Sequence, residues 1–425
     1  MPNGAPVPVF TLGYFYLPCH SRAVYRLSPT TTNAPDTMIY RRATVNDPMP
    51  RFPRKFFRNI MTRALFPLLG LLSAGCANIS PPAYVPGERA RVAGDSPTTA
   101  EAEAAKSPVL QRLVDEAAAL RPLAVSSLGQ RFLDAVRALP PISTRVAFVN
   151  EITREYFSVA EKSALPAAAQ TKLAEVKLDE YRYYYTKYGS PLAYLRAVDL
   201  AAANGIADIA GRRVLDFGYG GIGQLRLLAS LGAHVTGVDP DSYLDALYSL
   251  PRDQGPVPPT ATRRGHPGTI TLAHGYWPKD PKMVERVGRG YDLILSKNTL
   301  KKGYIKPDRK IDKRQQIDLG VSDDSFLKTI YGTLNPGGLL IIYNLYPKPP
   351  DGKAAYNPQA DARSPYTREQ YEKTGLRVLA FNLEDHTVAR NMGRALRWDR
   401  NDKGEITSDL ETTLFAMVTM VARPL

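Results

Sequence analysis

An acidic residue and three spaced glycines follow a short apolar segment near the middle of the chain. Residues 213–224 read Arg-Val-Leu-Asp-Phe-Gly-Tyr-Gly-Gly-Ile-Gly-Gln, with the acid at Asp216 and the spaced glycines at Gly218, Gly220 and Gly223. Glycines let the backbone turn tightly and let a ligand approach the main chain. The start of a following helix offers unpaired N–H groups to a carboxylate or phosphate. The pattern predicts a strand, a ligand-binding turn and a helix.

The charge of Asp216 helps to decide which class of ligand this turn binds. The glycine spacing also satisfies the dinucleotide-binding pattern, so an NAD-dependent oxidoreductase is an alternative interpretation. In dinucleotide folds the position of Asp216 is apolar, and a carboxylate there would repel the pyrophosphate. A ligand with a cationic end would be attracted instead. The next predicted strand, residues 234–238, ends at Asp239, where an acid can accept hydrogen bonds from ribose hydroxyls.

The elements that must position these residues are also visible in the sequence. Apolar runs, turn residues and helical spacing predict the remaining strands and one late helix. They are a third strand at 269–273 before His274 and Gly275, a fourth at 291–296, a fifth after Pro336-Gly337-Gly338, late strands at 376–381 and 414–421, and a helix near 388–396.

Jointly these motifs resemble the class I S-adenosylmethionine-dependent methyltransferases, specifically an uncharacterised bacterial family, over about half of the chain. The resemblance implies a Rossmann-like α/β domain at 205–425, with a seven-stranded sheet, helices on both faces and an antiparallel late strand. It implies S-adenosyl-L-methionine as cofactor. The residues that it assigns to the cofactor are Asp216, Gly218, Tyr219 and Gly220 for the amino acid end, Asp239 for the ribose and His274 for the adenine, with Gly223, Pro240, Gly275 and Ser296 beside them. His274 stands where the family usually has an acid or amide, and a surface histidine is an equal alternative.

Methyl transfer needs alignment and exclusion of water more than a fixed catalytic signature. The Asn/Asp-Pro-Pro-aromatic tetrad of many enzymes that methylate amino groups of bases and glutamine is absent after the fourth strand, where residues 296–300 read Ser-Lys-Asn-Thr-Leu. We predict that Lys297 and Asn298 face the methyl group, with Tyr304 third. The basic segment 301–314 suits an anionic acceptor, or is a solvated loop. Asn344 and Tyr346 either line the same pocket or cap the sheet.

The chain carries a net charge of +14, but half of it lies in residues 1–75, which hold nine basic and two acidic residues. We therefore do not expect a nucleic acid partner. Its two cysteines, Cys19 and Cys76, lie outside the predicted domain, so a disulfide framework or a cysteine zinc site is excluded there. No metal site is expected.

The N-terminal quarter, residues 1–107, has a different composition. We interpret residues 1–60 as disordered or as a mis-assigned leader, 61–76 as a signal segment, and 77–107 as a flexible linker. Small residues before Cys76 resemble the lipobox of bacterial lipoproteins, although Ser73 departs from it. This predicts membrane association through Cys76 in the cell envelope, with a cytoplasmic protein as the alternative. Export would separate the protein from S-adenosylmethionine, which is made in the cytosol.

Residues 108–204 show three- and four-residue apolar spacing and predict an α-helical cap before the sheet. Its last part, 181–191, is rich in tyrosine. We expect these tyrosines to pack the cap onto the domain, with Tyr188 and Gly189 as further cofactor candidates.

Three functional classes follow. The first is a methyltransferase acting on a small or lipid-linked acceptor, the second is an NAD-dependent oxidoreductase, and the third is an exported binding module that kept the fold without turnover.

Overall fold

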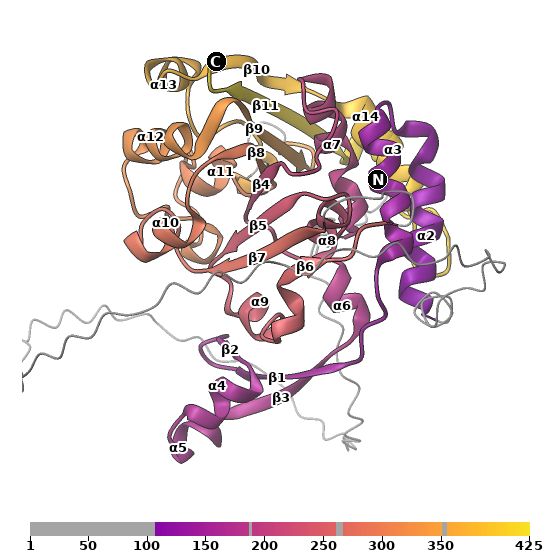
Figure 1. Cartoon of the computed structure of the whole chain (residues 1–425), viewed down its shortest axis with the longest axis vertical. Coiled ribbons are helices and arrows are strands. Elements are labelled where there is room, and N and C mark those ends of the chain that lie inside the picture. Colours follow the sequence, from indigo (N-terminus) through magenta and orange to yellow (C-terminus); the bar gives the residue numbers. More distant parts are fainter. Residues whose placement is uncertain (1–106, 187–188, 261–266, 351–354) are drawn as a thin grey trace, which may run out of the picture. The chain divides into compact units, whose positions relative to one another are not determined.

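The computed structural model describes residues 107–186, 189–260, 267–350 and 355–425. The predicted leader, the signal segment with Cys76 and the linker up to residue 106 lie outside these ranges. The described residues form an eight-stranded sheet with the strand order β10-β11-β9-β8-β4-β5-β7-β6 (Figure 1). Its strands are β4 (Arg213–Phe217), β5 (His234–Asp239), β6 (Gly255–Val257), β7 (Gly268–His274), β8 (Tyr291–Lys297), β9 (Leu334–Tyr346), β10 (Arg377–Glu384) and β11 (Phe415–Ala422).

The direction of the strands separates this sheet from a dinucleotide-binding one. Strands β7, β5, β4, β8 and β9 are parallel, whereas β11 lies antiparallel between β9 and β10. The classic dinucleotide order has no such inserted strand. The antiparallel late strand predicted from the sequence is therefore confirmed. The predicted number of seven strands is too low for the described residues, because β6 adds an eighth at the edge beside β7. This strand has three residues including Pro256, too short to show any periodicity.

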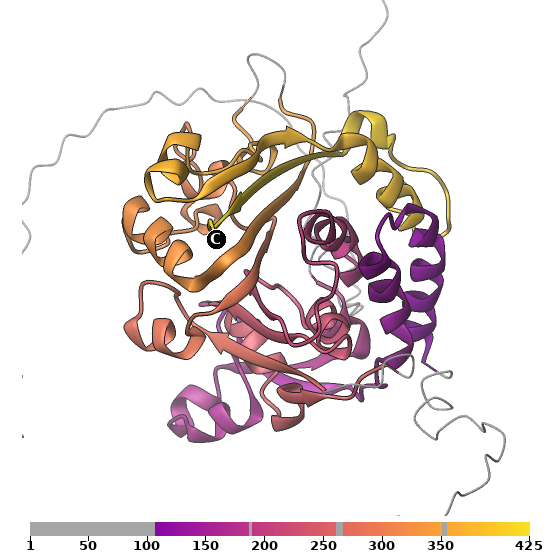
Figure 2. The ribbon, with the colours of Figure 1, turned by 45° about the horizontal axis from the view of Figure 1, so that its top comes forward.

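Helices cover both faces of the sheet, as Figure 2 shows from a second direction. One face packs against α7, α8, α9 and α14, with α2 and α3 in an outer layer. The other face packs against α10, α12 and α13. Side chains along each strand alternate between the two cores: Val214 belongs to the first and Leu215 to the second. The helices are α2 (Pro108–Leu120), α3 (Ser127–Asp134), α7 (Leu195–Ala203), α8 (Gly223–Ser230), α9 (Ser242–Leu247), α10 (Pro281–Val287), α11 (Lys302–Ile305), α12 (Asp323–Thr333), α13 (Arg368–Lys373), α14 (His386–Ala395) and α15 (Leu410–Thr413).

The segment before the sheet is not wholly helical, and in this respect the prediction of an α-helical cap over 108–204 is wrong. A three-stranded antiparallel sheet of order β2-β1-β3 forms its middle part. The apolar helical spacing covered only the segments that became α2 and α3, whereas β1 carries Val146, Phe148 and Val149, residue types that favour strands. The elements are β1 (Arg145–Asn150), β2 (Tyr156–Phe157), β3 (Leu173–Leu178), α4 (Val159–Ala164), α5 (Ala167–Gln170) and α6 (Glu180–Tyr184).

A buried ion pair attaches this small sheet to the main one. Arg145 of β1 binds both carboxylate oxygens of Asp253 at 2.7 Å, and the Tyr183 hydroxyl donates to the same carboxylate at 2.9 Å. The guanidinium of Arg226 in α8 donates to the Tyr183 oxygen at 2.7 Å. All four side chains are buried, so the network joins β1, α6 and α8 without access to water.

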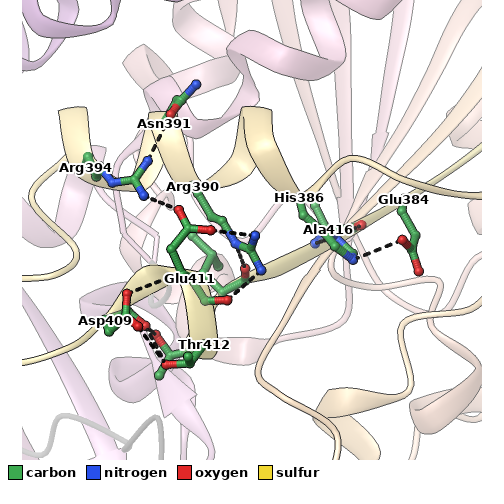
Figure 3. Close-up of polar contacts among 11 residues, drawn as sticks. Glu384, His386, Arg390, Asn391, Arg394, Asp409, Glu411, Thr412 and Ala416 are labelled. Atoms are coloured by element: carbon green, nitrogen blue, oxygen red, sulfur yellow. Dashed lines mark hydrogen bonds and ion pairs between the residues drawn. The ribbon is translucent and has the colours of Figure 1, made fainter.

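Contacts with α14 hold the start of β11 and the residues before it in place (Figure 3). Arg390 of α14 donates to the Glu411 carboxylate at 2.8 Å and to its backbone carbonyl at 2.6 Å. The Ala416 backbone N–H donates to Nδ1 of His386 at 3.2 Å. These bonds fix the start of β11 beside α14. No helix of the described residues is long and apolar enough to cross a membrane.

Candidate functional site

Asp216 lies at the carboxyl end of the central strand β4, with its side chain completely buried. The Tyr194 hydroxyl donates to Oδ1 at 3.3 Å, and the Gln224 side-chain amide donates to Oδ2 at 3.0 Å. Burial raises the pKa of Asp216 to about 7, since removal from water disfavours the charged form, although the two hydrogen bonds oppose this shift. A carboxylate has about four lone-pair positions, so these two bonds leave it able to accept more.

The glycine turn follows directly and is left-handed at two positions. Gly218 has φ of 75° and Gly220 has φ of 59°, values that side chains rarely adopt. The Gly218 N–H donates to the Val238 carbonyl at 2.8 Å, which joins the end of β4 to the end of β5. A Cβ atom on Gly218 would lie only 2.2 Å from the Thr299 hydroxyl oxygen. The turn thus requires glycine both for its conformation and for its contact with the chain after β8.

Asp239 at the end of β5 meets the same turn. Its Oδ2 accepts from the Gly220 N–H at 3.3 Å, and its Oδ1 accepts from the Asp241 N–H at 3.0 Å. The Gly275 N–H donates to the Asp239 backbone carbonyl at 3.1 Å. This bond joins the end of β7 to the end of β5. The predicted residue Pro240 is exposed beside it. The carboxyl ends of β4, β5 and β7 therefore converge on the glycine turn.

His274 closes this side of the site. Its ring lies 6.2 Å from the Tyr219 ring, centroid to centroid, and its Nε2 lies 3.6 Å from the Asp245 carboxylate. Burial lowers the pKa of His274, while Asp245 opposes the shift. The side chain is 12% exposed, so it is not a surface histidine. A largely neutral ring beside Tyr219 is able to stack on a planar ligand or to bond with it.

Two of the predicted cofactor residues have packing roles in the structure. A Cβ atom on Gly223 would lie 2.4 Å from the Tyr184 carbonyl oxygen, so this glycine lets the tyrosine-rich segment reach the start of α8. The Ser296 hydroxyl is buried and accepts from the Leu300 N–H at 3.2 Å. Tyr183, Tyr184 and Tyr185 of this segment are buried, in line with the packing role expected for them, whereas Tyr181 is exposed and Tyr188 lies outside the described residues.

Two lysines form the basic side of the site, on and after β8. The Lys297 amine has no hydrogen-bond or ion-pair partner among the described residues, and it lies 5.7 Å from the centre of the Tyr194 ring. Burial lowers the pKa of Lys297 to about 8, while nearby Asp216 opposes this shift. Lys301 is 3% exposed and donates to the Leu345 carbonyl at 2.6 Å. Burial, with the charge of Lys297, lowers its pKa to about 7.

The other predicted catalytic residues lie further along the same edge. The Asn298 side chain accepts from the Leu345 N–H at 2.7 Å, and Asn298 itself has φ of 63°, so it fastens the end of β8 to β9. Tyr304 lies half-buried on α11, with the Lys301 Nζ 5.3 Å from its ring centre. Asn344 is buried and donates to the Leu300 and Ala362 carbonyls, which supports the capping interpretation. Tyr346 stacks on Phe415.

Sequence reasoning missed four residues that shape the site: Tyr194, Gln224, Thr299 and Lys301. Gln224 lies inside the glycine motif, five residues after Tyr219, and its amide also donates to the Tyr219 carbonyl at 2.6 Å. That placement was a usable signal. Tyr194 comes from outside the sheet domain, and nothing in its spacing indicates a contact with Asp216.

The polar groups around the turn fit a polar cofactor with a cationic end. Three of their side-chain atoms are buried and have no hydrogen-bond partner among the described residues: the Tyr219 hydroxyl, Oε1 of Gln224 and Nδ1 of His274. Buried polar atoms are normally paired, so an unpaired group is typical of a ligand site. The Gln224 oxygen and the Asp216 carboxylate are acceptors, as an ammonium group requires.

Comparison with known proteins gives matches in fold only. No protein-family model and no curated protein matches the sequence. Among solved structures, the cyclopropane synthase MmaA2 from Mycobacterium tuberculosis is similar, with 14% identity, 58% of this chain and 91% of that chain covered, and a TM-score of 0.33. A phosphoethanolamine N-methyltransferase from Haemonchus contortus, solved with S-adenosylhomocysteine, has 14% identity, 60% and 63% coverage and a TM-score of 0.31. The magnesium protoporphyrin IX methyltransferase from Synechocystis, solved with S-adenosylmethionine, has 14% identity, 55% and 79% coverage and a TM-score of 0.27. These structures are similar to this chain in its mixed α/β fold with a mostly parallel central sheet, and two of the three are described as methyltransferases.

Proposed function

We propose that this chain binds S-adenosylmethionine and transfers its methyl group to a small or lipid-linked acceptor. The observation that carries the proposal is a completely buried carboxylate, Asp216, directly before a left-handed glycine turn at the end of the central strand. A buried carboxylate is costly unless a cation or hydrogen-bond donors compensate it. A cofactor with an ammonium group at its amino acid end supplies both, because an ammonium is a cation and a hydrogen-bond donor.

The residues around the turn have distinct roles in this proposal. Asp216 and Gln224 would bind the ammonium group, and the backbone of Gly218 and Gly220 would lie against the amino acid portion. Asp239 would accept the ribose hydroxyls, and His274 would face the adenine. S-adenosylmethionine supplies a methyl group already activated by a positively charged sulfur.

Lys297 is our candidate for the proton acceptor. Its amine extends from the end of β8 without a hydrogen-bond or ion-pair partner among the described residues, and a pKa of about 8 keeps part of it neutral near neutral pH. The neutral amine would take the proton that an acceptor hydroxyl or amine must lose when it gains the methyl group. Lys301 and Tyr304 would lie beside an anionic acceptor.

Binding by the full chain tests the proposal against its main alternative. In calorimetric titrations we expect S-adenosylmethionine to bind at micromolar affinity, and Asp216→Asn to weaken binding at least about tenfold, the loss of one charge-assisted contact. Asp292→Asn is the matched control, because Asp292 lies at the opposite end of the neighbouring strand β8. Tighter binding of NAD than of S-adenosylmethionine would favour the oxidoreductase and overturn the proposal.

Turnover separates a methyltransferase from a binding module without activity. The full chain is incubated with S-adenosylmethionine labelled in its methyl group and with lipid and small-molecule fractions of the native cell. We expect label in one fraction, together with S-adenosylhomocysteine. The rate should rise with pH through about 8 and lose this rise in Lys297→Met, while Lys313→Met, on the basic loop, keeps it. Binding without labelled product in any fraction would support the inactive module.

A further inference from the structure

The face of the sheet that packs against α10 and α12 changes character along its length. Towards the carboxyl ends of the strands it is apolar, with Leu215, Phe217, Val238 and Ala273 in the second core. Two or more residues earlier on the same strands, the side chains are polar. Because residues two apart share a face, these polar residues are Arg213 on β4, His234 and Thr236 on β5, and Thr269 and Thr271 on β7.

This polarity is unusual for the position. Inner strands of a parallel sheet covered on both sides are normally apolar throughout. Here Arg213, His234 and Thr269 lie directly opposite one another in one row across three strands, and Thr236 and Thr271 form the next row. They line a groove, a cavity of about 230 Å³ at the amino ends of the strands. Asp216 lies at the opposite, carboxyl ends. None of the residues that line this cavity is acidic.

Arg213 is held in place but not neutralised. Its guanidinium carbon lies 4.7 Å from the centre of the Tyr291 ring, and its side chain has no hydrogen-bond or ion-pair partner among the described residues. The adjacent Asp292 carboxylate is engaged by the Arg212 guanidinium at 3.1 Å and by the Arg213 backbone N–H at 2.9 Å. A guanidinium presents five N–H donors in a rigid plane, a geometry that suits phosphate.

The neighbouring groups add hydrogen-bonding capacity. Nδ1 of His234 lies 3.0 Å from the Thr269 hydroxyl, which orients the ring within the row. The Tyr291 hydroxyl donates to the Val287 carbonyl at 2.6 Å and lies 2.9 Å from the Thr236 hydroxyl, so the ring beneath Arg213 is itself held by the second row. A histidine ring nitrogen and the Thr271 hydroxyl are further donors within the same cavity.

We propose that this groove, lined by Arg213, His234, Thr269 and Thr271, binds an oxyanion, either free phosphate or the phosphate of a small phosphomonoester. The site is independent of the one proposed for S-adenosylmethionine, since the two lie at opposite ends of the strands. A bound phosphate would bridge β4, β5 and β7, and would therefore stabilise the ends of these strands.

Two adjacent arginines offer a matched test. The full chain is titrated with inorganic phosphate and with glycerol phosphate at constant ionic strength, and binding is followed by calorimetry. We expect Arg213→Met to weaken phosphate binding at least tenfold and Arg212→Met to change it less than twofold, because Arg212 points to Asp292. Thr271→Val, which keeps the shape of the side chain and the charge of the groove, should weaken binding about threefold and serves if Arg213→Met fails to fold.

Equal losses in the two arginine variants would show that phosphate responds to surface charge in general, and would overturn the proposal, as would the absence of saturable binding. Tighter binding of glycerol phosphate than of inorganic phosphate would identify a phosphomonoester as the ligand, and equal affinity would identify the free anion. Titration of the same variants with S-adenosylmethionine should give the wild-type affinity. That readout keeps failure of the groove distinct from failure of the cofactor site.

Discussion

Asp216 has a buried carboxyl group at the end of a central strand, and the rest of the site can be understood from its electrostatics. Burial favours its protonated form, whereas a bound cation would favour the charged form. The buried carboxyl therefore lowers the stability of the ligand-free chain and raises its affinity for a cationic ligand. Active sites commonly show such an exchange of stability for function.

The pH dependence of unfolding should reveal this cost. The folded pKa of Asp216, about 7, lies above the ordinary value of 3.8, so the folded state keeps a proton that the unfolded state has lost between these values. Stability from this group is present at low pH and is lost as pH rises towards 7. We expect Asp216→Asn to lack this loss, and so to raise the free energy of unfolding at pH 8 by about 1–3 kcal/mol.

Urea unfolding at pH 5 and pH 8 provides the measurement for this prediction. The wild-type chain and Asp292→Asn, the matched control, should both lose stability relative to Asp216→Asn between the two pH values. Identical pH dependence in wild type and Asp216→Asn would show that the carboxyl is not perturbed by burial.

At the scale of elements, the site depends on how closely the glycine turn and the chain after β8 approach each other. Thr299 occupies the space next to Gly218, so this turn has both a conformational and a steric requirement. Gly211 has a similar φ of 69° but has no atom within 4 Å of an added Cβ. The two glycines thus separate the two requirements.

Alanine at each position should give different losses of stability. We expect Gly211→Ala to lower the free energy of unfolding by about 1 kcal/mol, the cost of a left-handed alanine. Gly218→Ala should lose more than about 3 kcal/mol, because Thr299 or the turn must also move. Chemical unfolding of both variants measures these values. Equal losses would mean that Thr299 rotates away at no cost.

The elements also show how far sequence alone can predict this structure. Apolar runs bounded by glycine, proline or charged residues predicted the strands of the main sheet except β6, since burial on both faces imposes that composition. β1 and β3 were missed because each has only six residues, so the helical spacing of the neighbouring segments outweighed their own residue types. Asp216, the glycines and Asp239 were predictable because ligand chemistry constrains them locally. Tyr194 reaches Asp216 only through tertiary packing, which no local pattern encodes.

At the scale of the whole molecule, the segment before the sheet is tied to it through buried charge. Four side chains from separate parts of the chain form one buried hydrogen-bonded network: Arg145, Asp253, Tyr183 and Arg226. Removing one partner of a buried ion pair leaves an uncompensated buried charge. This lowers the stability of the fold much more than replacing both partners by apolar residues.

Substitutions in this network should therefore be strongly non-additive. We expect Arg145→Met to lower the free energy of unfolding by about 3–5 kcal/mol, and the double variant with Asp253→Leu to recover part of the loss. Arg368→Met is the control, since its pair with Glu372 is exposed and should contribute less than about 1 kcal/mol. Thermal and urea unfolding test this. If the two single substitutions, Arg145→Met and Asp253→Leu, simply add in the double variant, the two side chains do not interact in the folded chain.

The affinity of the full chain for S-adenosylmethionine, measured by calorimetry across pH, tests the central claim most directly. A cationic ligand bound by Asp216 must lower its pKa, so binding releases a proton below pH 7. We predict that affinity rises at least about tenfold from pH 5.5 to pH 7.5 and that Asp216→Asn abolishes the rise. An affinity that stays constant across this range, or that is equal in the two proteins, would contradict the assignment of Asp216 to the cofactor.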